Sequence, residues 1–388
     1  MRVLFTGQPG IKKSIAINRL IERAQADTDT GAINHLCVED CIKRRFHGIV
    51  PFLEESARLA REDTWKKAAR EVLADIKGSS ASHLFLEMHC VFYRKGRWFC
   101  PIDLALIQKF KPDCIVTLVD NVYEVQRILR HDNQRDPAIH SLRLREISMW
   151  RSQEIVLSYL FAKAIEIAGR PVDVYVVPVK HHVDMLFRLL FRPDVLRVYA
   201  SFPITGVRKV PGLKAEVDSF RSRLNGSFTV FDPLTFEEEI LRIKASEARD
   251  NQKTVSLSSE DGGTLSLEGT LVQGREKAYP IKYPLKLPLD EVKEVALDAH
   301  WQTEQYDFTL VDQADCVVAY RPEPRGIVSS GVRAELQYAR GKKRIVIYYD
   351  PKEDPNPEDT PFRGYGLIRT NLGDVFEDLA LIQAERNQ

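Results

Sequence analysis

The chain has 388 residues, of which 44% are hydrophobic and 29% are charged, and its 56 Lys and Arg nearly balance its 55 Asp and Glu to leave a formal net charge of +1. This length allows two or three domains that each bury a core, and the charge balance gives no overall indication of nucleic-acid or anionic-membrane binding. No apolar run approaches the ~20 residues that span a bilayer, and no signal-peptide pattern is present, so no membrane partner is predicted. Six scattered cysteines without a CxxC pair favour reduced thiols and a cytoplasmic protein, with no protein-bound metal.

The first predicted element is a buried strand from Arg2 to Thr6, and a glycine-rich turn leads from it into a helix. A strand, such a turn, a Lys-Ser pair and a helix predict a phosphate-binding loop, because the turn and the helix N-terminus present N–H groups to an anion. Lys12 stands where the pattern G-x-x-x-x-G-K-[ST] has glycine, and its side chain is expected to crowd the loop or change its backbone, which argues against efficient phosphoryl transfer. The loop residues expected to bind the nucleotide and Mg²⁺ are Gly7, Gly10, Lys13 and Ser14.

Strands and helices alternate over about the first 190 residues, which predicts a doubly wound parallel sheet. One strand runs from His83 into Glu87-Met88-His89, another from Cys114 to Val119, and a long helix from Arg143 to Ile167.

The order of these segments resembles the adenylate kinase family, particularly its archaeal type. The resemblance rests on the Gly-x-Pro-Gly loop, on Glu87-Met88-His89 and on the Pro-Asp-x-Ile-Val-x-Leu strand that starts at Pro112. It implies that ATP or another nucleotide binds with Mg²⁺, which Glu87 helps to hold directly or through water. It also implies a lid with paired arginines, for which the candidates are Arg127, Arg130 and Arg135. The same arginines are equally well explained as solvated residues of a surface helix.

A second α/β unit is predicted from the strand Leu196 to Ser201 onward. Residues from about Glu237 to His300 are predicted to form an insertion, with an alternating hairpin pattern from Thr254 to Leu267 and an edge strand or extended arm within Tyr279 to Leu289. A lid, a dimer arm and a surface for another protein all remain open for this insertion.

The stretch from Tyr306 to Tyr338 carries the candidate chemistry. It predicts a helix over about Asp307 to Ala314, a buried strand from Cys316 to Tyr320, a loop rich in Pro, Gly and Ser, and a helix from Val332 to Arg340. Ligands of open α/β sheets collect at the carboxyl ends of strands, where this loop lies. Ser329, Ser330 and Gly331 are therefore expected to bind an anion, with Glu335 about one helical turn away.

This stretch resembles the nucleoside 2-deoxyribosyltransferase superfamily, and more closely its 2′-deoxynucleoside 5′-phosphate N-hydrolase branch. The matching motifs are Asp307, the segment Gln313-Ala314-Asp315 before Cys-Val-Val-Ala, and Ser329-x-Gly331-Val332-x-x-Glu335-Leu336, with Tyr199 to Gly206 as the first strand and loop. The resemblance implies that Glu335 attacks C1′ of the sugar and that Asp307 lies beside the leaving base.

The same resemblance implies binding roles. Ser329 and Gly331 would hold a 5′-phosphate, since the true transferases tend to have aspartate at the position of Ser329. The loop that contains Ser201, Thr205 and Gly206 would cradle ribose and phosphate. Asp315, the third candidate catalytic residue, is expected to position the reacting groups or to cap locally rather than to react.

The sequence thus predicts an α/β protein with two doubly wound, Rossmann-like domains, an adenylate-kinase-like P-loop domain over 1–190 and a deoxyribosyltransferase-like domain over 195–388. The predicted function is an N-glycosidase of (deoxy)nucleoside 5′-monophosphates that the P-loop domain feeds or regulates, and a homo-oligomer is implied by the family. The alternatives are a nucleotide kinase with a C-terminal binding module, a nucleotide-binding protein without turnover, and cleavage of NAD in an antiviral effector.

Overall fold

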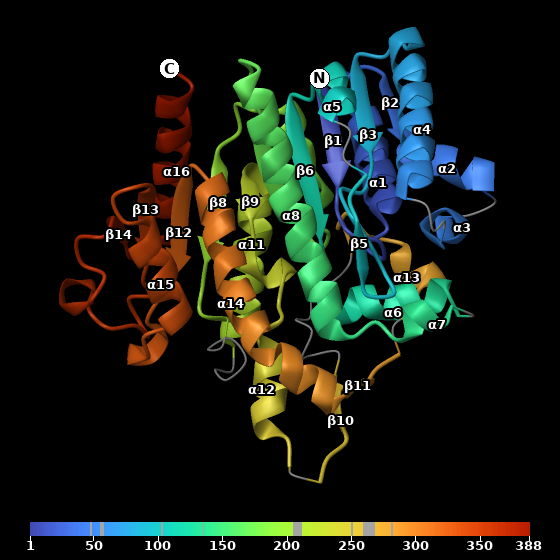
Figure 1. Ribbon diagram of the computed structural model, residues 1–388. Helices are drawn as coiled ribbons and strands as arrows, with labels where there is room; N and C mark the ends of the chain where they lie inside the picture. The colour runs from blue at the N-terminus through green and yellow to red at the C-terminus, as the bar shows by residue number, and fades with distance from the viewer. Residues whose placement is uncertain are drawn as a thin grey trace. The chain divides into compact units, whose positions relative to one another are not determined.

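A computed structural model describes residues 1–46, 49–54, 58–101, 104–134, 136–204, 212–249, 251–258, 268–280 and 282–388 (Figure 1). The described chain divides into two compact units. The first unit comprises residues within 1–180, 238–267 and 271–299, and the second comprises residues within 181–237, 268–270 and 300–388. Residues predicted as the insertion of the second domain thus group largely with the first unit.

The first unit contains a five-stranded parallel sheet in the order β2-β3-β1-β6-β7 (Figure 1). Its strands are β1 (Arg2–Thr6), β2 (Ile33–Cys37), β3 (His83–Glu87), β6 (Cys114–Val119) and β7 (Asp173–Pro178). All six residues of β6 are buried, as expected for a strand covered on both faces. The central position of β1 places the loop that follows it between the carboxyl ends of β3 and β6.

Helices and short strands complete the first unit. From the first 180 residues come α1 (Lys13–Gln25), α2 (Val38–Phe46), α3 (Ile49–Glu54), α4 (Arg58–Gly78), α5 (Leu104–Phe110), α6 (Val122–Asp132), α7 (Pro137–His140) and α8 (Leu144–Ile167), with the hairpin β4 (Phe92–Arg94) and β5 (Arg97–Phe99). The later residues add α12 (Glu239–Glu247), β10 (Thr254–Leu257), α13 (Arg275–Ala278) and β11 (Leu285–Pro288).

The strand β10 pairs antiparallel with β11, with Val255 opposite Leu287. The hairpin partner expected for it, Thr264 to Leu267, lies outside the described residues. The edge strand expected between Tyr279 and Leu289 is present as β11.

The second unit contains a five-stranded parallel sheet in the order β14-β13-β12-β8-β9. Its strands are β8 (Arg197–Ser201), β9 (Thr229–Phe231), β12 (Cys316–Tyr320), β13 (Arg344–Tyr348) and β14 (Leu367–Arg369), and its helices include α9 (Val183–Phe191), α11 (Leu213–Ser227), α15 (Ser330–Ala339) and α16 (Leu372–Arg386). The strand order reverses between β8 and β12, and this reversal is the point at which open α/β sheets bind ligands. The predicted α/β class with two doubly wound parallel sheets is confirmed.

The helix before β12 is longer than expected. The sequence predicted a helix from about Asp307, whereas α14 runs from Leu289 to Gln313. Asp290 and Glu291 lie in its first turn, where acidic side chains favour a helix start, and buried Val292, Val295 and Ala299 recur at helical spacing. Within the described ranges no helix combines the length and apolar character that a membrane span requires.

Candidate functional site

Ser201 and Glu335 form the centre of the candidate site in the second unit. Ser201 ends β8 and Glu335 lies on α15, the helix that follows the neighbouring strand β12. The Ser201 hydroxyl donates a hydrogen bond of 2.5 Å to Oε2 of Glu335, and both side chains are buried. The fold thus joins two residues that are 134 positions apart in the sequence, at the reversal of strand order.

Asp307 on α14 is the second carboxyl group of the site. Burial raises the pKa of Asp307 well above its ordinary value, and Glu335, Glu304 and Glu237 raise it further through charge repulsion. Burial also raises the pKa of Glu335 to about 7, although the hydroxyls of Ser201 and Tyr199 act to lower it. Two carboxyl groups in this environment separate into an anion and a neutral acid near neutral pH, and the serine hydroxyl favours Glu335 as the anion.

Tyr199 is a functional candidate that the sequence analysis did not single out. It precedes Ser201 by two residues on β8, so both side chains lie on the same face of the sheet. The Tyr199 side chain is fully buried, and its hydroxyl has no hydrogen-bond partner of good geometry among the described residues. Burial raises its pKa well above the ordinary value, and the charges of Asp307 and Glu335 add to this. A buried hydroxyl beside two carboxyl groups is a polar group available to a ligand.

The predicted anion-binding turn begins α15. Ser329 is the N-cap residue, and its hydroxyl accepts a hydrogen bond of 3.4 Å from the Val332 N–H. Ser330 and Gly331 are exposed, and a Cβ atom added at Gly331 would meet no atom within 4 Å. The first turn of α15 is therefore open to an anion, and Glu335 projects from the second turn of the same helix.

Asp315 does not belong to this group. It precedes β12 at the amino end of the strand, whereas Ser201 lies at the carboxyl end of the parallel neighbour β8. Its carboxylate pairs with Arg197 at 2.5 Å and with Arg386 at 3.2 Å, which together with a backbone hydrogen bond lowers its pKa despite partial burial. Asp315 is therefore a structural anchor and is too far along the sheet to position the reacting groups. Thr205 and Gly206 lie outside the described residues.

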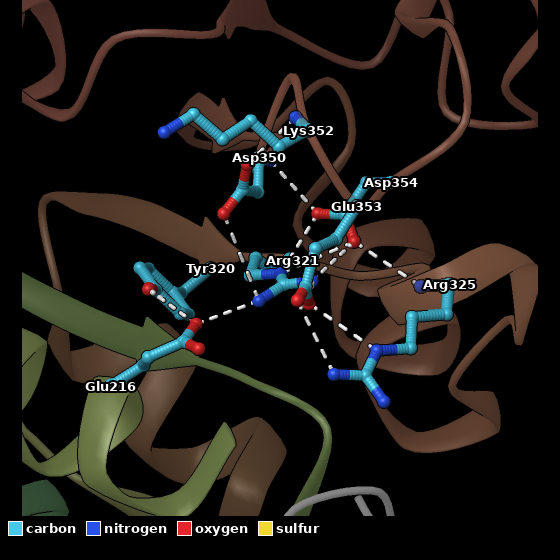
Figure 2. Close-up of polar contacts among 8 residues, drawn as sticks. All are labelled: Glu216, Tyr320, Arg321, Arg325, Asp350, Lys352, Glu353 and Asp354. Carbon is cyan, nitrogen blue, oxygen red and sulfur yellow. Dashed lines mark hydrogen bonds and ion pairs between the residues drawn. The ribbon is translucent and has the colours of Figure 1, made fainter. Parts of the chain in front are cut away.

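Arg321 organises the loop between β12 and α15 (Figure 2). Its guanidinium group is 1% exposed and pairs with Glu216 at 2.6 Å and with Glu353 and Asp354 at 2.8 Å each. Asp350 lies 4.0 Å from the same group, and Arg325 adds a contact of 3.3 Å to Glu353. Arg321 lies at the start of the loop that leads to Ser329. Its ion cluster connects this part of the loop with α11 and with the segment after β13.

The predicted phosphate-binding loop of the first unit, Gly7 to Ser14, joins β1 to α1. Gly7 has a φ of +133°, and a Cβ atom there would lie 2.4 Å from the Leu118 carbonyl oxygen, so only glycine fits. Lys12 has a φ of +66° and a ψ of +51°, the left-handed conformation that glycine adopts most readily. The loop thus accepts lysine at the glycine position at a cost of about 1 kcal/mol of backbone strain.

The side chains of Lys13 and Ser14 are directed to groups at the carboxyl ends of β1 and β3. The Lys13 ammonium group is buried and donates to the Gly7 carbonyl oxygen at 2.8 Å, while the Ser14 hydroxyl donates to Glu87 at 2.8 Å. Burial acts to raise the pKa of Glu87, but the hydrogen bond from His35 and the charge of Lys13 lower it overall. A hydroxyl beside an ionised carboxylate fits Mg²⁺, which takes few protein oxygens and completes its shell with phosphate and water. Among the described residues no group of three or more His, Cys, Asp or Glu could hold a metal by itself.

Glu39 and His89 also adjoin the loop. Glu39 was not predicted, and His89 was named only as part of the Glu87-Met88-His89 motif, without a role of its own. The Glu39 side chain accepts a hydrogen bond of 2.7 Å from the His89 N–H, and burial raises the pKa of Glu39 to about 7. Burial lowers the pKa of His89 well below its ordinary value, and the charge of Lys13 adds to this, so the ring is neutral. The neutral His89 ring therefore adds no positive charge beside the Lys13 ammonium group.

Residues 273–280, which include α13, lie against the loop and are here called the strap. Arg275 is buried and pairs with Asp120 at 2.7 Å, and it donates to the Ile11 carbonyl oxygen at 3.4 Å. Lys12 pairs with Asp132, and its ammonium group lies 4.7 Å from the centre of the Tyr279 ring. The strap therefore fixes the last residues of the loop before Lys13.

The candidate lid arginines make contacts within the first unit. Arg127 donates to Glu124 at 2.9 Å and to the Tyr279 carbonyl oxygen at 3.1 Å, and Arg130 donates to the Leu142 carbonyl oxygen at 3.1 Å. In this conformation both groups hold α6 to its surroundings and do not project as a lid would. Arg135 lies outside the described residues.

No family model and no curated protein matches the sequence. Among solved structures 35 chains match. One is a shikimate kinase from Bacteroides thetaiotaomicron, which is 12% identical, with a TM-score of 0.31, and the alignment covers 50% of this chain and 97% of that one. The functional proposal therefore rests on the side chains described above.

Proposed function

We propose that the second unit is an N-glycosidase that hydrolyses the bond between base and sugar in a (deoxy)nucleoside 5′-monophosphate. The observation that carries the proposal is the buried pair of Ser201 and Glu335, joined at 2.5 Å at the reversal of strand order, with Asp307 as a second carboxyl group of raised pKa. The breaking of a glycosidic bond uses such a pair, because an anion stabilises positive charge at C1′ while a neutral acid supplies a proton to the leaving group.

The two carboxyl groups take different roles. Glu335, the anion, approaches C1′ as a nucleophile, so a C1′–O bond forms as the C1′–N bond breaks. Asp307, kept protonated by burial and by its acidic neighbours, gives its proton to the departing base. A water molecule then attacks C1′ of the glycosyl ester and loses its proton to the Asp307 carboxylate, and Glu335 is released as an anion.

The phosphate of the substrate would lie at Ser329 to Gly331. Support comes from the exposed first turn of α15 and from the open space above Gly331. A 5′-phosphate there receives N–H groups and the positive end of the helix dipole, and no acidic side chain in the first helical turn opposes it.

The first unit would bind ATP or another nucleotide with Mg²⁺ and feed or regulate the second. Lys13 and the N–H groups of Gly7 to Ser14 would hold the phosphates, and Ser14 and Glu87 would hold Mg²⁺, which neutralises phosphate charge when bound. The hydrogen bond between Ser14 and Glu87 supports this role.

The test is incubation of the purified protein with ribo- and deoxyribonucleoside monophosphates, nucleosides, ATP and NAD in the presence of Mg²⁺, with products separated by chromatography. The wild type is expected to release free base from a monophosphate, Glu335→Gln to release none, and the surface variant Glu377→Gln to match the wild type. Base released equally by Glu335→Gln would overturn the assignment, and nicotinamide released from NAD in place of free base would change the substrate to a dinucleotide.

A nucleotide kinase is the second candidate, and the contact of Ser14 with Glu87 supports it as well, because a kinase also needs Mg²⁺ at the nucleotide phosphates. In this case the same incubation yields a phosphoryl-transfer product such as ADP without free base. The product would be lost in Lys13→Ala and kept in Glu335→Gln, the reverse of the pattern expected for the glycosidase.

A further inference from the structure

A cavity of about 740 Å³ lies at the amino-terminal edge of the first sheet. Its wall includes Arg2 and Leu84 at the starts of β1 and β3, the second half of α4, and Lys109 and Lys111 at the end of α5. The phosphate-binding loop follows the carboxyl end of β1, so this cavity is a separate site on the same unit. Its volume falls in the range of about 300–1,000 Å³ that is typical of small-molecule sites.

The cavity has a strongly positive wall. The basic side chains that line it are Arg2, Arg70, Lys77, Lys109 and Lys111. None of the described residues that line it is acidic. The whole chain has a formal net charge of only +1, so five cations around one cavity are a marked local excess.

Among the described residues, no acidic side chain pairs with four of these five basic side chains, so their positive charge is available to a ligand. Within the described ranges Arg70, Lys77, Lys109 and Lys111 form no ion pair, and the guanidinium group of Arg2 donates to the Phe110 carbonyl oxygen at 2.9 Å. Asp113, a nearby acid, is occupied by the Arg170 guanidinium group and by the Arg2 N–H.

Local secondary structure explains why some, but not all, of these five positions carry a basic residue. Lys77 and Lys109 lie in the last turns of α4 and α5, where cations favour a helix end. Arg70 lies within α4, and Lys111 has a φ of +52°, a conformation in which glycine is favoured over lysine. Neither helix capping nor backbone conformation accounts for Arg70 and Lys111, whereas an anionic ligand does.

The cavity also has an apolar surface, to which Leu73, Ile76 and Leu84 contribute. A cationic wall beside an apolar surface suits a molecule with a flat, weakly polar ring and several negative charges. We propose that this cavity binds a nucleoside polyphosphate, with the base against the apolar residues and the phosphates at the basic side chains. The site is independent of the glycosidase and of the phosphate-binding loop.

The test uses the full chain carrying Lys13→Ala, which weakens binding at the loop, and fluorescent N-methylanthraniloyl-ATP as the probe. Adding Arg70→Gln, Lys77→Gln and Lys111→Gln is expected to raise the Kd about tenfold or more, since three of the five basic side chains that line the cavity lose their charge. The control set Lys253→Gln, Lys286→Gln and Lys293→Gln makes the same change of charge elsewhere on the first unit and is expected to leave the Kd within about twofold.

Thermal unfolding of both triple variants checks that each is folded before binding is compared. Inorganic tripolyphosphate is expected to displace the probe from the Lys13→Ala protein. Absence of binding to that protein, or an equal loss of affinity in both triple variants, would overturn the proposal. Displacement by a single-stranded oligonucleotide at far lower concentration than by ATP would also overturn it, since the cavity would then be part of a nucleic-acid surface.

Discussion

Glu335→Gln should stabilise the second unit at alkaline pH while it abolishes base release. The pKa of Glu335 rises from its ordinary 4.5 to about 7 on burial. A carboxyl group with a raised folded-state pKa contributes stability below pH 4.5 that is lost as the pH rises through 7, because the folded state then loses a proton that it holds tightly. The loss amounts to about 3 kcal/mol, since each pKa unit corresponds to about 1.4 kcal/mol. Glutamine keeps the shape and the acceptor for Ser201 and does not ionise.

Differential scanning calorimetry of wild type, Glu335→Gln and Glu377→Gln at pH 5, 6 and 8 measures this effect. The unfolding transition of the second unit should be nearly equal for wild type and Glu335→Gln at pH 5, and higher for the variant at pH 8, by several degrees. Glu377 is exposed, so its variant should follow the wild type at every pH. A Glu335→Gln protein that is no more stable than wild type at pH 8 would refute the inference that the buried Glu335 carboxylate destabilises the folded state.

Three further predictions concern other parts of the two sites. Tyr199→Phe removes a buried hydroxyl that lowers the pKa of Glu335, so the acidic limb of the pH profile of kcat/KM should move to higher pH. The free energy of unfolding should stay the same or increase, because the lost hydroxyl has no hydrogen-bond partner of good geometry among the described residues. An acidic limb at the wild-type pH would contradict this prediction. Ser14→Ala should weaken nucleotide binding about tenfold with Mg²⁺ present and leave it unchanged in EDTA, as measured by titration calorimetry. Arg321→Met leaves the fully buried Asp354 without its cation and should cost about 3–5 kcal/mol in urea unfolding, and a cost below about 1 kcal/mol would show that the cluster is not a structural hub.

The local architecture of both candidate sites could be predicted because their signals are short in the sequence. The segments Gly7 to Ser14 and Ser329 to Glu335 each combine a turn with the start of a helix, and both turn-to-helix transitions are present. The parallel pairing of β8 with β12 then brings Ser201 to Glu335, as strand topology requires.

Other contributors have no such signal. Arg321 is a single arginine in an irregular loop, and its partners come from α11 and from the segment after β13, so no spacing pattern links them. Glu39 follows β2, a strand that is only partly buried and weakly apolar. Tyr199 could have been found, because alternation along β8 places it on the face of Ser201. Asp315 is the opposite case, a residue that matched a sequence motif but does not belong to the site. It lies at the amino end of β12, where it pairs with Arg197 and does not reach Ser201 and Glu335.

The buried ion pairs of the first unit also constrain how the chain can be divided and how it is made. Arg275 contacts Ile11, 264 residues earlier, and Glu238 pairs with the buried Arg151 at 2.7 Å. A chain that ends near residue 190 would leave the buried Arg151 without Glu238, at a cost of several kcal/mol, and would leave the buried Asp120 with Lys180 at 3.9 Å in place of its closer partner Arg275. During synthesis on the ribosome the first sheet can be complete long before these partners emerge. The loop from Gly7 to Ser14 would then acquire its final contacts only after β8 and β9 of the second unit have been translated, so these contacts would form late in synthesis.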